Sequence, residues 1–299
     1  MTWHRVTRGA ARTAAKDAED AWLGDLATIQ LVLPADSRWT HLTGARLRGW
    51  WLPPVPRGLP LLAAGTTQVR RRGVSHARRA EVRPAQIVKG IRVDPAVDIL
   101  VACARDLGEL DLLCLVVGAL VTKDCALSEL TAVAERSFRG ARALRRVLRR
   151  ASDLPESIWE VLLAELHRSV GIEVKPQHVV HHPDTGAFVA RGDLWLVGTR
   201  VLHEYDGAGH RDADQHANDL VRDRRLDRAR WRRRGYVSRD LLDDAVHVLS
   251  DADEAVGRRH RPERIRPWYA LLQDSLFTPR GRHALLRRVI DPPARRHCR

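Results

Sequence analysis

Two acidic side chains are expected to face each other across a hairpin in the second half of the chain. Two segments rich in β-formers flank Gly198-Thr199, which has the length of a two-residue turn. If the residues on either side of this turn pair with each other, each step away from it adds one residue to each strand. Asp193 then lies directly opposite Glu204, with Cβ atoms roughly 5 Å apart.

These carboxylates suggest a metal site. Like charges opposite each other weaken a sheet, so a compensating interaction is expected. Mg²⁺ or Mn²⁺ bound by Asp193 and Glu204 would provide it, and would also activate water and stabilise charge on a phosphate. Asp206, two residues after Glu204, projects to the same face because strand side chains alternate. The alternative is that these acids only occupy the solvated face of an edge hairpin.

Two further residues could complete a catalytic site. Glu160 falls in the first turns of a helix predicted over about residues 155–170, and it could add an oxygen ligand. Alternatively, it only complements the helix dipole. His210 follows a strand end that contains Gly207 and Gly209, which allow close backbone approach to a ligand. His210 could bind a metal, transfer a proton or contact a phosphate, or it could be a loop histidine without a task.

An arginine-rich segment follows the acidic residues. A helix is predicted over about residues 212–234, stopped by Gly235, and its part from 218 to 234 holds eight arginines and three aspartates. Arginines beside an acidic site can hold the nucleic-acid backbone without reading its sequence. The candidates for this contact are Arg222, Arg225, Arg228 and Arg232. The alternative is a soluble helix with ion pairs along a solvated face.

Composition favours a nucleic-acid partner. The 299 residues include 51 Lys and Arg against 37 Asp and Glu, so the net charge is +14. A chain this basic usually binds a polyanion, with DNA as the expected partner, although a bias toward Arg and Ala alone would also raise the charge. The four cysteines form no Cys-x-x-Cys pair, which excludes a typical zinc site and fits a reducing compartment. Without an apolar stretch typical of a signal peptide or bilayer span, we expect a soluble cytoplasmic protein.

The pattern of elements predicts an α/β protein in three parts. Residues 1–152 read as a small α+β domain, with helical spacing of apolar residues over 97–104, 110–121 and 127–134. Residues 153–257 read as helix, three strands, helix, strand and helix, which is typical of a mixed sheet flanked by helices. Residues 258–299 form a basic, proline-containing tail that we expect to be only partly ordered.

With these residues in view, the second half resembles the Vsr-like (very-short-patch-repair) endonuclease domain, domain of unknown function 559, of the PD-(D/E)-x-K nuclease superfamily. The matching pieces are Glu156-Ser157-x-x-Glu160, Val189-Ala-Arg-Gly-Asp193-Leu, Glu204-Tyr-Asp206-Gly207-x-x-His210 and Asp219-x-x-Arg222-Asp223, with Leu226 and Gly235 downstream. The resemblance implies a restriction-endonuclease-like fold with Asp193 and Glu204 as metal ligands. Glu160, Asp206 and His210 would surround them. The lysine that the superfamily carries after the glutamate is replaced by Asp206, and the Vsr-like branch also lacks it.

The first half is similar to the regulatory part of type IV antitoxins of the abortive-infection AbiEi type. The pieces that carry this likeness are Trp3-His-Arg-Val-x-Arg-Gly, Thr40-His-Leu-Thr-Gly-Ala and Gly90-Ile-Arg-Val-Asp-Pro-Ala-Val-Asp98. The likeness implies a regulatory or DNA-interaction domain in residues 1–152.

Two hypotheses of different classes follow. The first is a metal-dependent DNA endonuclease that uses the acidic residues and no small-molecule cofactor. The second is a non-catalytic DNA-binding regulator, or antitoxin-like protein, that keeps a degenerate nuclease fold. The acidic site separates them, because a binder has no need of facing carboxylates near DNA. The sequence leaves open the DNA substrate and the need for a partner protein.

Overall fold

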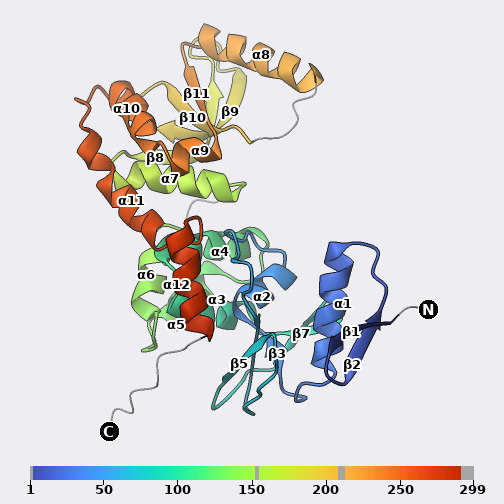
Figure 1. Ribbon diagram of the computed structural model, residues 1–299. Coiled ribbons are helices and arrows are strands. Elements are labelled where there is room, and N and C mark those ends of the chain that lie inside the picture. Colours follow the sequence, from blue (N-terminus) through green and yellow to red (C-terminus); the bar gives the residue numbers. More distant parts are fainter. Residues whose placement is uncertain (1–2, 152–154, 208–212, 291–299) are drawn as a thin grey trace.

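The protein is a mixed α/β structure, and the computed structural model describes residues 3–151, 155–207 and 213–290, without the side chains of 213–220. The elements before α7 occupy the lower part of Figure 1, and those from α7 to α10 occupy the upper part. Among the described residues, no helix combines the length and apolar character that crossing a bilayer requires.

The first part joins two sheets to a group of helices. One sheet is the hairpin β1–β2, and the other has five strands in the order β5-β4-β3-β7-β6. The elements are β1 (Trp3–Thr7), β2 (Ala10–Thr13), α1 (Ala18–Gln30), β3 (Arg38–Trp39), α2 (His41–Leu47), β4 (Leu61–Gly65), β5 (Val74–Arg78), β6 (Gln86–Val88), β7 (Ile91–Val93), α3 (Ala96–Asp106), α4 (Glu109–Val121), α5 (Leu127–Ala134) and α6 (Ala141–Leu148). The three helices predicted from apolar spacing are confirmed as α3, α4 and α5. Helix α4 is apolar on nearly every side because it lies inside this core.

The second part is a four-stranded mixed sheet with helices, as predicted. Its strand order is β11-β10-β9-β8, with β10 and β11 parallel and the other pairs antiparallel. The elements are α7 (Ile158–Ser169), β8 (Val174–His181), β9 (Phe188–Leu196), β10 (Val201–Tyr205), α8 (Ala213–Arg228), β11 (Arg232–Tyr236), α9 (Ser238–Leu242) and α10 (Ala245–Ala255). The Ser157 hydroxyl caps α7 by accepting from the Glu160 N–H (3.2 Å), and Gly171, at φ 71°, follows the helix end as expected.

The predicted helix over 212–234 was too long. Helix α8 ends at Arg228, Arg230 takes a left-handed φ of 61°, and β11 begins at Arg232. The arginine run has no alternation of apolar and polar residues, so nothing local marks it as a strand. Its strand conformation comes from parallel pairing with β10, which buries Tyr236 at the end of β11.

The expected tail contributes folded elements up to residue 290, where the description ends. They are η1 (Pro262–Ile265), α11 (Arg266–Gln273) and α12 (Pro279–Ile290). Trp268 is fully buried, and its indole N–H donates to the backbone oxygen of Leu241 at 2.8 Å. The Asp111 carboxylate of α4 accepts from the backbone N–H of Leu276 at 2.9 Å and from the Ser275 hydroxyl at 2.5 Å.

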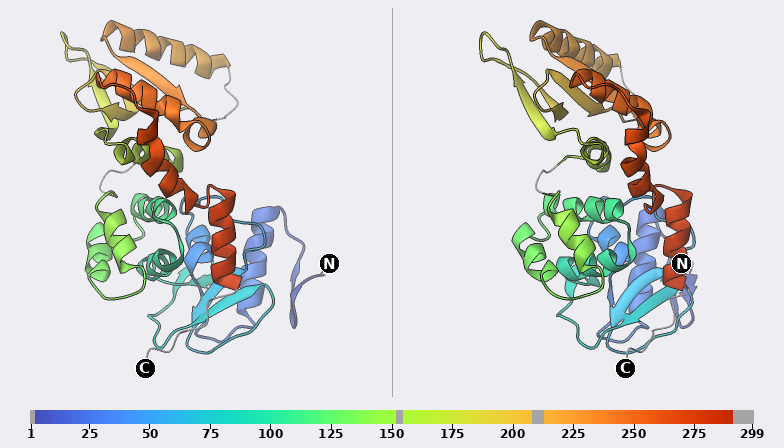
Figure 2. Two further views of the ribbon diagram at one scale, coloured as in Figure 1. Left: turned by 60° about the vertical axis from the view of Figure 1, so that its left-hand side comes forward. Right: turned by 90° about the vertical axis from the view of Figure 1, so that its left-hand side faces the viewer.

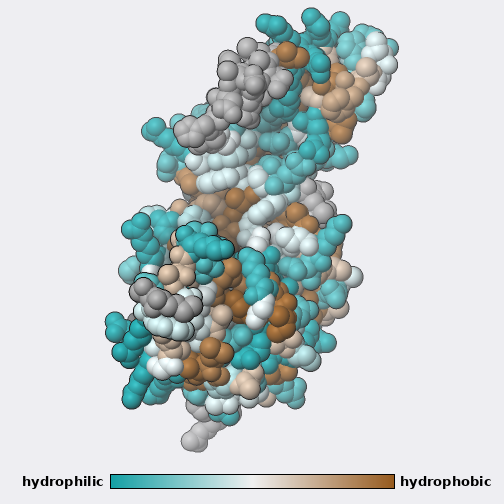
Figure 3. Space-filling model, turned by 90° about the vertical axis from the view of Figure 1, so that its right-hand side faces the viewer, coloured by the Kyte–Doolittle hydropathy of each residue, from teal (hydrophilic) through white to brown (hydrophobic). Residues whose placement is uncertain are grey.

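Helix α11 therefore connects the two parts of the molecule, and both views in Figure 2 show it crossing the narrow middle. The same residues explain why the segment up to residue 290 is folded, since burying an aromatic ring and satisfying a buried carboxylate both oppose its loss of conformational entropy. Apolar residues continue through this middle region, which is brown in Figure 3 on a mainly hydrophilic face.

Candidate functional site

The hairpin β9–β10 has the predicted register. Leu202 pairs with Trp195 and His203 pairs with Leu194, so one step further from the turn brings Glu204 opposite Asp193. Beyond this pairing, the Oδ2 atom of Asp193 accepts a hydrogen bond from the backbone N–H of Tyr205 at 3.0 Å. Thus the carboxylate of Asp193 is tied to β10 at the point where the regular pairing stops.

Glu204 is the most enclosed of the predicted ligands, with 3% of its surface exposed. Arg222 of α8 binds it in a bidentate manner, through Nη1 to Oε2 at 2.9 Å and Nη2 to Oε1 at 2.5 Å. Arg233 of β11 donates from Nε to the same Oε2 at 2.5 Å. Such charge-assisted pairs are strong, so two guanidinium groups balance the charge of this buried carboxylate.

Asp193 lies in a different electrostatic environment. Burial raises the pKa of Asp193 to about 6, the hydrogen bond from Tyr205 opposes this rise, and the negative charges of Glu160 and Glu204 add to it. Arg222 lowers the pKa of Asp193, and its effect is the smallest of those named. The charge of the Glu204 carboxylate is thus balanced, whereas the ionised form of Asp193 is disfavoured. A cation bound beside Asp193 would stabilise its ionised form.

Glu160 takes part in the start of α7. Its Oε2 atom accepts from the backbone N–H of Glu156 at 2.9 Å and from the Nε2 of Gln177 at 2.7 Å. The first bond supports the alternative in which Glu160 completes a helix N-terminus. The negative charge of Glu160 also contributes to the raised pKa of Asp193.

Asp206 forms an ion pair with Arg233. Arg233 therefore contacts two acidic side chains, that of Glu204 in β10 and that of Asp206 just after this strand. The carboxylate of Asp206 lies against Gly235, where a Cβ atom would collide with it. Gly235 was interpreted as a helix stop, but it lies within β11 opposite Glu204 and leaves room for this carboxylate. His210 lies outside the described residues.

The four candidate arginines divide into two groups. Arg222 binds Glu204, while Arg225, Arg228 and Arg232 have exposed side chains, with Arg232 on β11 rather than on the helix. Sequence reasoning missed Arg233, although it belongs to the same run of arginines. Only the pairing of β11 beside β10 distinguishes Arg233 from its neighbours, so no local signal could have found it.

A buried network that the sequence did not reveal holds β10 and β11 against α7 and α10. His167 donates from Nδ1 to the Leu163 carbonyl at 2.7 Å, and its Nε2 lies 2.9 Å from Nδ1 of His203. Burial lowers the pKa of His167 to about 4, so the ring is neutral and its Nε2 accepts from His203. Tyr236 donates to Asp251 at 3.0 Å, which completes the support behind the acidic residues.

The donor chemistry of Asp193 and Glu204 fits a hard divalent cation. Among the described residues, no three His, Cys, Asp or Glu groups converge on a metal position. Mg²⁺, however, is often held by one or two carboxylates, with water and substrate phosphate completing its ligands. A cation at this place requires Arg222 and Arg233 to exchange Glu204 for another anion, and a phosphate is the anion that guanidinium groups bind best.

No family model, no curated protein and no solved structure matches the chain. The likeness to Vsr-like endonucleases and to AbiEi-type antitoxins stays an expectation from sequence motifs.

Proposed function

We propose that the sheet β8–β11 with α7 and α8 is a restriction-endonuclease-like domain that hydrolyses phosphodiester bonds in DNA with Mg²⁺ or Mn²⁺. One observation carries the proposal. The hairpin register puts Asp193 opposite Glu204, and the pKa of Asp193 is raised to about 6 by burial and by neighbouring carboxylates. A buried carboxylate whose ionised form is disfavoured marks a place where a bound cation would be stabilising.

The residues have separate tasks in this proposal. A bound divalent cation supplies charge stabilisation on the phosphate and a more acidic water. Asp193 and Glu204 provide the oxygen ligands, while Glu160 keeps the pocket acidic. Arg222 and Arg233 neutralise Glu204 in the free protein and transfer to a backbone phosphate when DNA arrives.

The exposed arginines hold the DNA around the scissile bond. Arg225, Arg228 and Arg232 are exposed on α8 and β11, the two elements that also carry Arg222 and Arg233. Contacts to phosphates position the duplex without reading bases. Such binding is consistent with the net charge of +14, which lowers the repulsion between an acidic pocket and a polyanion.

A specific observation favours a second candidate, a non-catalytic DNA-binding regulator. Both oxygens of Glu204 already bind guanidinium groups, so Arg222 and Arg233 can be regarded as permanent replacements for a cation. In that case the acidic residues only maintain the fold, and DNA binding does not depend on a divalent metal.

Cleavage of supercoiled and of mismatch-containing DNA with and without Mg²⁺ tests the proposal. We expect Asp193→Asn to abolish cleavage and to leave DNA affinity nearly unchanged. Asp184→Asn is the matched control, because its side chain is 86% exposed in the turn before β9. Metal-dependent cleavage by the Asp193 variant would remove this residue from the mechanism. Tight DNA binding by the wild type without cleavage of any substrate would favour the regulator.

A further inference from the structure

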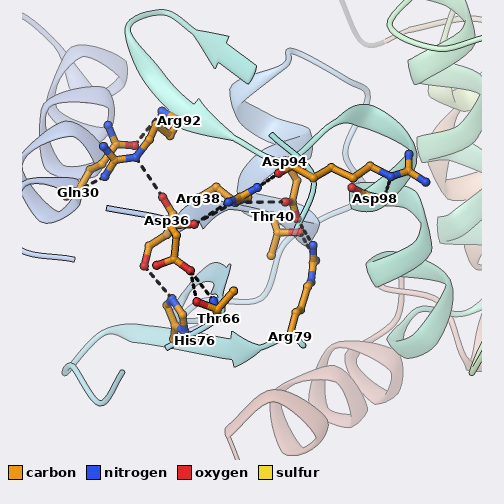
Figure 4. Close-up of polar contacts among 12 residues, drawn as sticks. Gln30, Asp36, Arg38, Thr40, Thr66, His76, Arg79, Arg92, Asp94 and Asp98 are labelled. Carbon is orange, nitrogen blue, oxygen red and sulfur yellow. Dashed lines mark hydrogen bonds and ion pairs between the residues drawn. The ribbon is translucent and has the colours of Figure 1, made fainter. Parts of the chain in front are cut away.

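A basic cavity lies in the first part of the molecule, away from the acidic residues of β9 and β10. It has a volume of about 620 Å³ and is bounded by β4, β5, the start of α2, the end of α3 and α12. A second cavity of about 510 Å³ adjoins it and shares Arg79, Arg105 and Arg139 with it. Figure 4 shows one wall, where Arg79 points toward Thr40 and Asp94.

The walls of the larger cavity carry an excess of positive charge. Two of its arginines have carboxylate partners, since Arg79 lies 2.8 Å from buried Asp94 and Arg105 lies 2.9 Å from Asp106. Among the described residues, Asp106 is the single acidic one that lines the larger cavity, and the smaller cavity adds Glu81 and Asp98. Three other lining arginines take part in no ion pair within the part of the chain that the structure describes, namely Arg78, Arg139 and Arg288. The cavity therefore favours an anion.

His41 lines this cavity and carries a hydrogen-bond donor that has no acceptor among the described residues. The side chain is nearly fully buried, with the residue 3% exposed, and its Nδ1 accepts from the backbone N–H of Leu42 at 2.8 Å. Burial lowers the pKa of His41 to about 4, so the neutral ring carries its proton on Nε2. Within the described residues Nε2 has no hydrogen-bond partner, and the nearest charged oxygen, that of Asp106, is 3.7 Å away.

His76 on β5 also has a buried ring nitrogen without a hydrogen-bond partner among the described residues. The residue is 8% exposed, its Nε2 lies 3.0 Å from the Ser37 hydroxyl, and its Nδ1 has no partner among the described residues. Buried polar atoms without partners cost stability and are uncommon, so two of them at one cavity need an explanation. Both histidines line the same cavity as the arginines without ion pairs, so this wall carries unsatisfied polar groups as well as positive charge.

We propose that the two adjoining cavities bind a mononucleotide, with its phosphate group near the shared arginines Arg79, Arg105 and Arg139. The combined size suits a small ligand, because ligand sites typically enclose about 300–1,000 Å³. Phe138, Val101 and Ala102 line the smaller cavity and provide an apolar surface for a base.

Calorimetric titration of the full chain with AMP, inorganic phosphate and adenosine tests this site. We expect AMP to bind more tightly than phosphate, and adenosine to bind at least about tenfold more weakly than AMP because it lacks the charge-assisted contacts. Failure of the wild type to bind AMP overturns the proposal. Equal affinity for AMP and phosphate overturns the assignment of a nucleotide.

Arg139→Gln is the variant that locates the ligand, since Arg139 is exposed and takes part in no ion pair with another described residue. We expect it to weaken AMP binding about tenfold. Arg142→Gln is the matched control, three residues further along on the exposed side of α6. An equal loss in both variants contradicts a site at this cavity. So does a short DNA duplex that competes fully with AMP, because it would identify the surface as a nucleic-acid contact.

Discussion

Arg233 and Glu204 lie on neighbouring parallel strands, and Nε of the arginine donates to Oε2 of the glutamate at 2.5 Å. Arg233 also contacts Asp206, so one guanidinium group links two of the acidic residues predicted for the site. The acidic pocket therefore includes its own counter-charges, supplied by β11 and α8.

Replacing Arg233 with Gln should destabilise the protein by roughly 3 kcal/mol, because Glu204 stays buried with one of its two cationic partners missing. Urea unfolding followed by circular dichroism measures this change. Arg225→Gln removes the same charge from an exposed position and should change stability by less than about 0.5 kcal/mol. A similar, small effect of both substitutions would show that the pair with Glu204 contributes little.

The double variant Asp193→Asn/Glu204→Gln should lose Mn²⁺ binding by at least about tenfold in calorimetric titrations, because it lacks both proposed oxygen ligands. The titration should be repeated with a non-cleavable DNA duplex present, since a phosphate is expected to displace Arg222 and Arg233. Asp184→Asn provides the control. If wild type and double variant bind Mn²⁺ equally with DNA present, the metal is held elsewhere.

The combined substitution of Arg225, Arg228 and Arg232 by Gln should weaken DNA binding and reduce the slope of log affinity against log salt by up to about 3. Each arginine that neutralises a phosphate contributes about one released counterion. Fluorescence anisotropy at several salt concentrations measures the slope. Arg239→Gln, an exposed change on α9, is the control, and an unchanged slope in the triple variant would place the DNA on another face.

Asp111 should make stability depend on pH. Burial raises its folded-state pKa to about 7, although hydrogen bonds from Ser275 and Leu276 oppose this. The folded state then holds a proton that the unfolded state has lost, so stability falls as pH rises from about 4 to 7, by on the order of 3 kcal/mol. Chemical unfolding at several pH values measures it. Asp111→Asn should lack this decline, and an equal decline in that variant would assign it to other groups.

The sequence by itself determined the elements whose pattern is local. Apolar spacing predicted α3, α4 and α5, and the turn at Gly198-Thr199 predicted the register that brings Asp193 opposite Glu204. Both results follow from short-range rules, namely the helical period and the alternation of side chains on paired strands. The proposed metal and nuclease roles of these residues go beyond those rules and stay predictions.

Only the tertiary structure decided the environment of these residues. Strand β11 forms from an arginine run because β10 provides a partner, and this pairing alone brings Arg233 to Glu204. Trp268 and Asp111 anchor a segment that composition predicted to be partly ordered. The unpaired nitrogen of His41 and the arginines near it come from several elements of the first part. Such contacts join residues far apart in the chain, so they depend on the packing of whole elements rather than on local propensity.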